Sequence, residues 1–192
     1  MWLGILPFVV SRIVCPESAA KAVRQGASMK ALLKVLGVIL ACLLLLLVVA
    51  RITGFEPNGR RPGLWLKGDL VTAPVSDWSF TDKIQNVKIQ TNTWYLLPHS
   101  VTINCVSYKG RLYLDSFYAA GLTYPHGRSW NEDVDRDHHV RIKIGNQLYD
   151  RTLALVTDPV EQAAVNEAKF KKYPDLKVPP GGTIVLFRVL DH

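Results

Sequence analysis

Residues 100–118 read SVTINCVSYKGRLYLDSFY, and they indicate the kind of fold more clearly than any other part of the sequence. Two runs of alternating apolar and polar residues flank Lys109-Gly110, a pair that suits the tight turn of a β-hairpin. The inward-facing positions of this hairpin are predicted to be Val101, Ile103, Cys105, Leu112 and Leu114. The stretch therefore predicts two antiparallel strands with one apolar face.

The same pattern recurs along the rest of the chain. A second predicted hairpin turns at Gly145-Asn146, with Val140, Ile142 and Ile144 opposite Leu148. The predicted strands lie at residues 64–71, 87–91, 100–108, 111–118, 140–144, 147–156 and 183–190. A parallel sheet would need crossover helices between most strands, and these connections are too short for them. The sequence therefore predicts a mainly β fold, a small closed barrel.

One helix is predicted among the strands, at residues 158–173. Asp158 can cap its start, Pro159 suits the first turn, and Tyr173-Pro174 ends it. Its apolar side is predicted to consist of Val160, Ala163, Ala164, Ala168 and Phe170. We expect a helix that packs on the barrel.

The most apolar stretch, residues 31–50, reads ALLKVLGVILACLLLLLVVA. A bilayer core of about 30 Å needs about 20 helical residues, and flanking Lys34 and Arg51 can extend toward the headgroups. We predict one transmembrane helix at residues 31–52. The alternative is a buried core helix, which the leucine run at residues 43–47 disfavours because it leaves no polar face.

The processing of this segment stays open. Val48-Val49-Ala50 offers small and aliphatic residues before a signal-peptidase cut, so a cleaved signal peptide competes with a signal anchor. Met29 opens MKALLKVLGVILAC, which has the basic start and apolar run of an export signal. We hypothesise that Met29 is the native start and treat residues 1–30 as an N-terminal extension whose native status is open.

The net charge of +7 is distributed unevenly along the chain. Residues 1–50 carry five Lys and Arg against one Glu, and residues 51–192 carry 18 Lys and Arg against 15 Asp and Glu. This asymmetry indicates membrane topology and not nucleic-acid binding. By the positive-inside rule we expect an inner-membrane, single-pass protein with its N-terminus in the cytoplasm. A Pro/Gly-rich linker at residues 53–63, not expected to pack, would then join the helix to a periplasmic domain at residues 64–192.

The cysteines form no disulfide framework. Cys15 and Cys42 lie before or within the membrane segment, which leaves Cys105 without a partner in the domain. Because Cys105 shares a face with apolar neighbours, a core thiol is favoured over a nucleophile. Phosphate-binding loops, dinucleotide fingerprints and serine-hydrolase elbows do not occur in the sequence, so no catalytic side chain is predicted.

An acidic run gives the only hint of a metal site. Asp133, Asp135 and Asp137 alternate like the first ligands of a calcium loop. His138 stands where the turn glycine belongs, and Ile144 stands where the bidentate glutamate belongs. The run is therefore interpreted as a solvated acidic turn, and no metal site is predicted.

A long connection, residues 118–131 (YAAGLTYPHGRSWN), is the candidate ligand site. It is longer than a structural link needs. Arg128 supplies a fork for a phosphate, and Trp130 supplies a flat face for a ring. The alternative is a packed surface loop with Trp130 as its anchor.

The chain also resembles a known superfamily. The segments that carry the resemblance are GRLYLDS at 110–116, GRSWNEDVDRDHHVRIKIG at 127–145, VTDPVEQAAVNEAKFKKYP at 156–174 and TIVLFRV at 183–189. Their order over residues 79–190 resembles the split β-barrel superfamily of pyridoxamine-phosphate-oxidase-like flavin proteins and their deazaflavin-dependent nitroreductase-like relatives. The resemblance implies a split β-barrel, which together with the predicted transmembrane helix gives a membrane-anchored split β-barrel.

It also implies a cofactor, FMN or a deazaflavin, between the subunits of a homodimer. The residues implied are Ser116 and Arg128 at the phosphate, Trp130 and Asn131 at the isoalloxazine ring, and His99 with Ser100 on the strand that faces it. Two features depart from the family: Asp137-His138 replaces a common Asn-Pro, and strand 100–108 lacks the usual basic residue.

Two functions remain open on the sequence. The first is a membrane-anchored flavin- or deazaflavin-type oxidoreductase, whose cofactor would pass hydride to a small or quinone-like acceptor. The second is a non-catalytic barrel without a cofactor, an accessory or assembly subunit of a membrane protein complex. It would dock its partner through Trp65, Trp78, Trp94 and Trp130.

Overall fold

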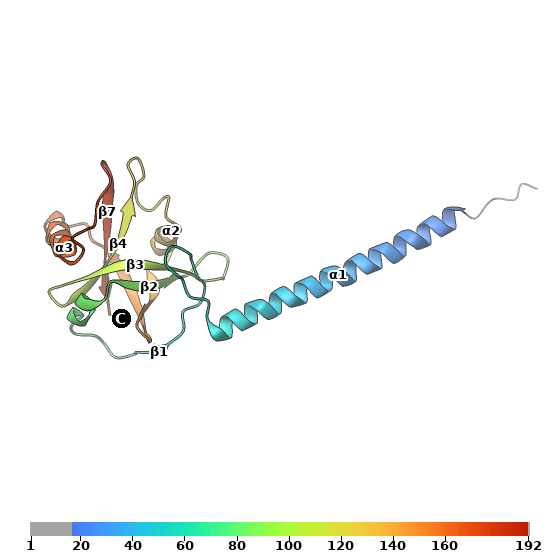
Figure 1. The fold of residues 1–192 in the computed structure, drawn as a ribbon, viewed down its shortest axis with the longest axis horizontal. Helices are drawn as coiled ribbons and strands as arrows, with labels where there is room; N and C mark the ends of the chain where they lie inside the picture. Colours follow the sequence, from blue (N-terminus) through green and yellow to red (C-terminus); the bar gives the residue numbers. More distant parts are fainter. Residues whose placement is uncertain (1–16, 192) are drawn as a thin grey trace, which may run out of the picture. The chain divides into compact units, whose positions relative to one another are not determined.

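The computed structural model describes residues 17–191, with side chains from residue 29 onward (Figure 1). The chain divides into a helical unit that ends at Leu47 and a β unit that begins at Val48. Of the predicted N-terminal extension, residues 1–16 lie outside the described residues.

The helix α1 runs from Glu17 to Thr53, so it begins well before the predicted residue 31. Its segment Met29–Thr53 is long and apolar enough to cross a membrane, by length and composition. The most apolar window of this segment is 0% buried in the structure, which contradicts the alternative of a core helix. A signal sequence would pass the same test, so that alternative stays open.

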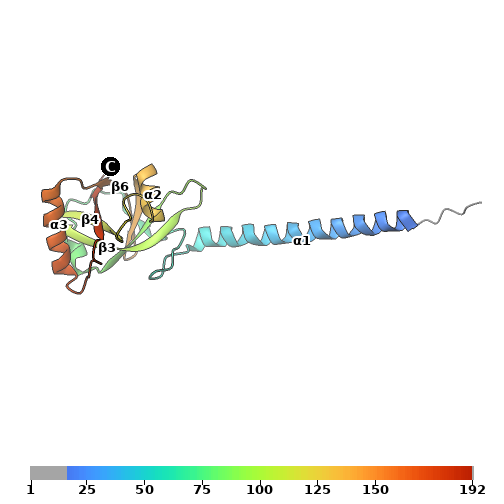
Figure 2. The same ribbon diagram turned by 90° about the horizontal axis from the view of Figure 1, so that it is seen from above.

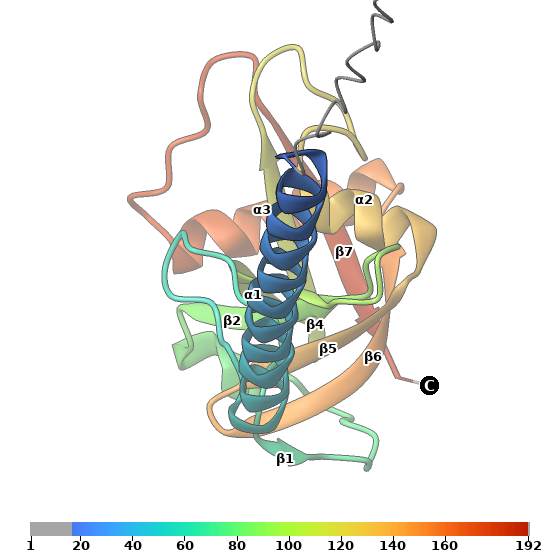
Figure 3. The same ribbon diagram turned by 90° about the vertical axis from the view of Figure 1, so that its right-hand side faces the viewer.

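Six antiparallel strands close into a barrel in the β unit (Figures 1 and 3). The strands are β2 (Asn86–Thr91), β3 (His99–Tyr108), β4 (Arg111–Tyr118), β5 (His139–Ile144), β6 (Gln147–Leu155) and β7 (Thr183–Leu190). Their order is β6-β5-β2-β3-β4-β7, and β7 pairs again with β6. This closure removes the sheet edges and confirms the predicted mainly β barrel.

Both predicted hairpins are present. Tyr108 pairs with Arg111 across Lys109-Gly110, and both turn residues have positive φ, as the tight turn requires. In the second hairpin Ile142 lies opposite Tyr149. The predicted partner Leu148 is therefore wrong by one residue, because the two-residue turn fixes the register.

The predicted strand at residues 64–71 is reduced to β1 (Asp69–Leu70), which pairs with β6 in parallel outside the barrel ring. Before β1 the segment changes partners: Leu64 N–H donates to the Phe55 carbonyl, and Leu66 N–H donates to the Gln90 side chain. The segment is apolar because it crosses the barrel surface, not because it forms one continuous ladder.

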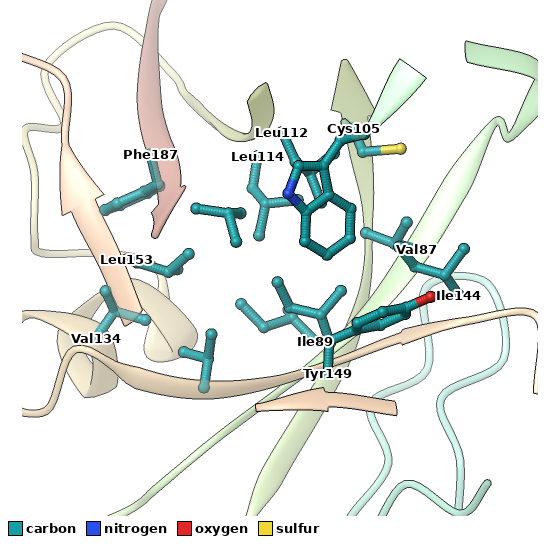
Figure 4. Packing of buried hydrophobic residues seen from close by; sticks show 14 of the residues in the cluster. Val87, Ile89, Cys105, Leu112, Leu114, Val134, Ile144, Tyr149, Leu153 and Phe187 are labelled. Atoms are coloured by element: carbon teal, nitrogen blue, oxygen red, sulfur yellow. The ribbon is translucent and has the colours of Figure 1, made fainter. Parts of the chain in front are cut away.

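The barrel core takes side chains from every strand of the ring (Figure 4). Figure 4 labels Val87, Ile89, Cys105, Leu112, Leu114, Val134, Ile144, Tyr149, Leu153 and Phe187. Each such side chain contributes roughly 1.5–3 kcal/mol on burial. Cys105 is fully buried, and desolvation raises the pKa of its thiol, which fits a core residue better than a nucleophile.

Besides a short 3₁₀ helix, η1 (Ser79–Lys83), two α-helices accompany the barrel. The first, α2 (Ser129–Arg136), was not predicted, and it replaces the solvated acidic turn. It buries Asp133 and Val134 against the barrel. The second, α3 (Pro159–Lys172), is the predicted packing helix with Asp158 as its N-cap (Figure 2).

The predicted apolar side of α3 is right only for Ala164 and Ala168, which are half-buried. Val160 is 75% exposed and Phe170 is 41% exposed, whereas Val165 and Lys169 are buried. Lys169 points inward because it pairs with Asp115, a buried residue of β4.

Candidate functional site

A cavity opens where strands β3 and β4 separate. The two strands pair only from Cys105↔Leu114 to Tyr108↔Arg111. Beyond that point β3 pairs with β2, and β4 pairs with β7. The space between them has a volume of about 580 Å³, and we call it the split cavity. Its walls are Val101, Thr102, Ile103 and Asn104 of β3 and Asp115, Ser116 and Phe117 of β4.

Three of the predicted site residues line this cavity: Ser116, Arg128 and Trp130. Arg128 immediately precedes α2, and Trp130 lies in its first turn, so the unpredicted helix is what brings both residues to the strand that carries Ser116. The long connection 118–131 thus returns to the cavity wall.

Arg128 is exposed, and its Nε–H donates to the Phe117 carbonyl at 2.9 Å. This hydrogen bond fixes the plane of the guanidinium at the cavity. A guanidinium carries four further N–H donors, which is the chemistry that recognises a phosphate or carboxylate.

Trp130 is 6% exposed and belongs mainly to the core. Its ring centroid lies 5.3 Å from that of Phe187, with the planes tilted by 56°. The predicted anchoring of the loop by Trp130 is therefore present, and the same residue contributes to the cavity wall.

Asn131 lies behind the cavity and not in its wall. It is fully buried, and its side-chain amide donates to Ser116 Oγ at 2.7 Å and to the Tyr118 hydroxyl. Tyr118 in turn donates to the Pro125 carbonyl. Asn131 therefore orients Ser116 and ties α2 to β4, which is a positioning role.

His99 and Ser100 start β3, but neither belongs to the described residues that line the split cavity. His99 Nδ1 lies 3.5 Å from Ser129 Oγ and 3.8 Å from Asp133 Oδ2, so it faces α2. Ser100 is fully buried and exchanges two backbone hydrogen bonds with Gly63.

The polar wall of the cavity includes a buried ion pair. Asp115 Oδ2 lies 2.5 Å from Lys169 Nζ of α3, and Lys169 also lies over the Phe117 ring at 4.2 Å. Desolvation raises the pKa of Asp115 and lowers that of Lys169. The lysine compensates a carboxylate that would otherwise repel an anion in the cavity.

The segment between α1 and β1 also reaches the cavity. A turn at Gly59, Arg60 and Arg61 closes one side of it. Asn58 and Arg61 exchange backbone hydrogen bonds across this turn. Sequence reasoning treated residues 53–63 as an unpacked linker and so missed Arg60 and Arg61; the run Arg60-Arg61 between glycines and prolines was the available signal.

Residues 54–63, which we call the arm, are attached to the barrel at two points. Gly63 bridges Ser100, and a Cβ on Gly63 would lie 2.4 Å from the Phe55 carbonyl oxygen. Glu56 pairs with Lys88 at 2.6 Å and with Lys143. Although burial opposes it, hydrogen bonds from both lysines lower the pKa of Glu56 to about 2. The arm is therefore part of the barrel surface.

The cavity fits a phosphorylated aromatic cofactor. Its volume lies within the roughly 300–1,000 Å³ typical of small-molecule sites. Arg60, Arg61 and Arg128 supply positive charge at the lining, Asp115 is neutralised by Lys169, and Ser116 presents a hydroxyl. Metal chemistry has no comparable support, because the described residues contain no group of three or more His, Cys, Asp or Glu placed to hold a metal ion.

No family model matches the sequence, and no curated protein is found as a relative. Among solved structures, the chain is similar to a conserved hypothetical protein from Mycobacterium tuberculosis, with 12% identity and a TM-score of 0.47 over 67% of this chain and 86% of that chain. It is similar to a protein of the pyridoxinephosphate oxidase family from Clostridium acetobutylicum, with 10% identity and a TM-score of 0.42 over 59% and 79%.

A third similar structure is an F420-H2 dependent reductase, with 18% identity and a TM-score of 0.41 over 56% of this chain and 95% of that chain. The second and third of these structures are of the kinds of protein that the sequence resembles.

Proposed function

We propose that the chain is a flavin- or deazaflavin-type oxidoreductase whose cofactor binds in the split cavity. The observation that carries this proposal is the convergence of Ser116, Arg128 and Trp130 on one cavity of suitable size. Ser116 lies on β4, whereas Arg128 and Trp130 lie at the start of α2, the next element along the chain. The long connection between the two elements leads back to the cavity wall.

In this proposal the phosphate is held by Arg128, with Ser116 as a second hydrogen-bond partner. Arg60 and Arg61 supply further positive charge from the arm. Trp130 and Ile103 offer apolar surface to a ring. His99, Ser100 and Asn131, which the resemblance also implicated, act through the elements they fix and not through the ligand.

A bound flavin or deazaflavin would supply hydride transfer, so the protein side chains need not act as acid or base. Their work is to bind the phosphate, orient the ring and exclude water. The pairing of Lys169 with Asp115 assists phosphate binding, because it removes a net negative charge from the cavity wall.

We further propose that α1 anchors the protein as a single transmembrane helix in the inner membrane, with the barrel on the periplasmic side. The span Met29–Thr53 supports anchoring, and the excess of cations before residue 35 supports the orientation. Anchoring would let a quinone-like acceptor reach the cavity from the bilayer. A homodimer follows only from the family resemblance and stays a prediction.

The proposal is tested by comparing a phosphorylated ligand with its phosphate-free form. Full-length protein in detergent micelles is titrated with FMN and with riboflavin, following flavin fluorescence, and a deazaflavin with and without its phosphate is measured in parallel. FMN or the phosphorylated deazaflavin should bind more tightly than its phosphate-free form. Arg128→Ala should weaken binding of the phosphorylated form about 10- to 100-fold, since a charged hydrogen bond contributes about 1.5–3 kcal/mol.

The matched control is Arg141→Ala, because Arg141 pairs with Asp150 at 2.7 Å and does not line the split cavity. This variant should leave both affinities unchanged. The cofactor assignment would be overturned if none of the four ligands binds. It would also be overturned if Arg128→Ala and Arg141→Ala lose the same amount of affinity.

The second candidate function, a non-catalytic accessory subunit, is favoured by one observation. Of the tryptophans predicted to dock a partner, Trp78 and Trp130 are buried, whereas Trp94 is 78% exposed. A partner surface on this barrel would therefore centre on Trp94 and not on the four tryptophans together.

A further inference from the structure

The connection between β2 and β3 carries an unusual exposed apolar tip. Residues 92–98 read NTWYLLP, and Trp94, Tyr95 and Leu96 are 78%, 50% and 94% exposed. We call these three residues the aromatic tip. Single exposed apolar residues are common on proteins, but three in succession at a loop end form a surface that water solvates poorly.

The loop that presents this tip is fixed at its base. Arg136 of α2 donates to the Asn92 carbonyl, and the Asn92 amide donates to Asp137 at 2.8 Å. Across the loop, the Thr93 hydroxyl donates to the Leu97 carbonyl. The C-terminal end of α2 and a hydrogen bond within the loop therefore hold the stem in place.

The tip itself has a defined conformation. The rings of Trp94 and Tyr95 meet edge to face, with centroids 5.5 Å apart. Leu96 has φ +68°, a left-handed conformation that is unfavourable for a leucine. The stem and this turn together direct apolar side chains outward.

The stem lies beside the arm that follows α1. Ser100, two residues after the loop, bridges Gly63 of the arm. In Figure 1 the loop between β2 and β3 and the arm lie at the same end of the β unit, and Figure 3 shows both from that end. The aromatic tip is thus at the end of the β unit that carries the arm.

The same end carries positive charge. Arg51, Arg60 and Arg61 are exposed, and residues 51–63 contain one acidic residue, Glu56. Glu56 is paired with two lysines, so it does not offset the arginines. Exposed aromatic and cationic residues together are the composition that binds the interface of an anionic bilayer.

We propose that the aromatic tip inserts into the headgroup region of the bilayer that α1 spans, beside anionic phospholipids bound by Arg51, Arg60 and Arg61. This inference rests on the proposed membrane anchoring, and its test does not require the cofactor. It gives the barrel a second attachment and brings the arginine-lined side of the split cavity close to the membrane surface.

The test uses full-length protein reconstituted in vesicles of phosphatidylcholine and phosphatidylglycerol at 3:1. The emission of Trp94 is obtained as the difference between wild type and Trp94→Phe. We expect a blue-shifted difference spectrum that is quenched at least twofold by phosphatidylcholine brominated in its acyl chains and little by aqueous acrylamide. The inference would be overturned if acrylamide quenches the Trp94 emission and brominated lipid does not.

A charge placed in the tip provides the second measurement. Leu96→Asp should reduce the quenching of Trp94 by brominated lipid, whereas Val160→Asp, at another exposed apolar position on α3, should not change it. If neither acrylamide nor brominated lipid quenches Trp94, a second copy or another protein covers the tip. That result would also overturn the inference.

Failure of the anchoring is separately visible. If an alkaline carbonate wash releases the chain from the vesicles, the transmembrane assignment of α1 is wrong and the inference falls with it. If the chain is retained and Trp94 is not quenched, α1 is anchored and only the inference about the tip is wrong.

Discussion

The ammonium of Lys169 lies 2.5 Å from the carboxylate of Asp115, and the two side chains are 0% and 2% exposed. Lys169 reaches from α3 to a β4 residue in the wall of the split cavity. The pair thus joins the packing helix to the candidate site. A charge buried in this way is tolerated only together with its partner.

Removing the cation alone should be costly. Lys169→Met leaves Asp115 as an uncompensated buried carboxylate, and we expect the free energy of unfolding to fall by about 3–5 kcal/mol. Urea unfolding of the full-length protein in micelles, followed by tryptophan fluorescence, measures this loss.

Removing both charges provides the control. Lys169→Met with Asp115→Leu should recover much of the loss, because well-packed apolar residues can replace a buried ion pair at little cost. If the single variant loses less than about 1 kcal/mol, the charges are not buried together as described.

The attachment of the arm by Glu56 should depend on pH. The pKa of Glu56 is lowered from 4.5 to about 2 in the folded protein. Because the folded pKa is depressed, the stabilisation is present above pH 4.5 and is lost as the pH falls toward 2. Glu56→Gln should therefore cost about 1–3 kcal/mol at pH 7 and about half as much at pH 3, where the folded Glu56 is still mostly ionised.

Urea unfolding at the two pH values checks this prediction, with Asp82→Asn, an exposed acid of η1, as the control. Equal destabilisation by Glu56→Gln at both pH values would show that its ionisation does not hold the arm.

The positioning role of Asn131 gives a third prediction. Asn131→Ala removes the amide that donates to Ser116 and Tyr118 in a fully buried site. We expect a loss of about 1–3 kcal/mol in stability, together with weaker FMN binding as Ser116 loses its orientation. Asn146→Ala, at an exposed hairpin turn, should change stability by less than about 0.5 kcal/mol. Unchanged stability in the Asn131 variant would contradict this role.

Arg60 and Arg61 of the arm should contribute to FMN binding through their positive charge more than through hydrogen bonds of fixed geometry. Arg60→Ala with Arg61→Ala should weaken FMN binding several-fold, and the effect should diminish at high ionic strength because both side chains are exposed. Arg128 is also exposed, but its hydrogen bond to the Phe117 carbonyl positions its guanidinium, so Arg128→Ala should retain more of its effect at high salt. Binding titrations at 0.05 M and 1 M salt distinguish the two cases. A salt-independent loss in the arm variant would contradict this division of roles.

The barrel was predictable because its hairpins are encoded locally. Lys109-Gly110 and Gly145-Asn146 combine turn chemistry with flanking alternation, and β4 and β7 occupy the predicted residues. The helix α2 was missed because its acidic residues dominate the pattern. Trp130 and Val134, four residues apart and both buried, were the available helical signal.

The site was predictable only in part, since its geometry arises from long-range packing. The resemblance suggested Ser116, Arg128 and Trp130, which do meet at one cavity. The inward lysine of α3 could not be read from periodicity, because Lys169 is buried by its pairing with Asp115, and local sequence does not reveal that pairing.

The central claim, that the split cavity holds a redox cofactor, is tested most directly by an absorption spectrum of the purified full-length protein, with mass spectrometry of what heat releases. We predict flavin or deazaflavin absorption, a released compound that carries a phosphate, and a colourless Arg128→Ala variant. A colourless wild-type protein that also fails to take up FMN or a phosphorylated deazaflavin would contradict the account.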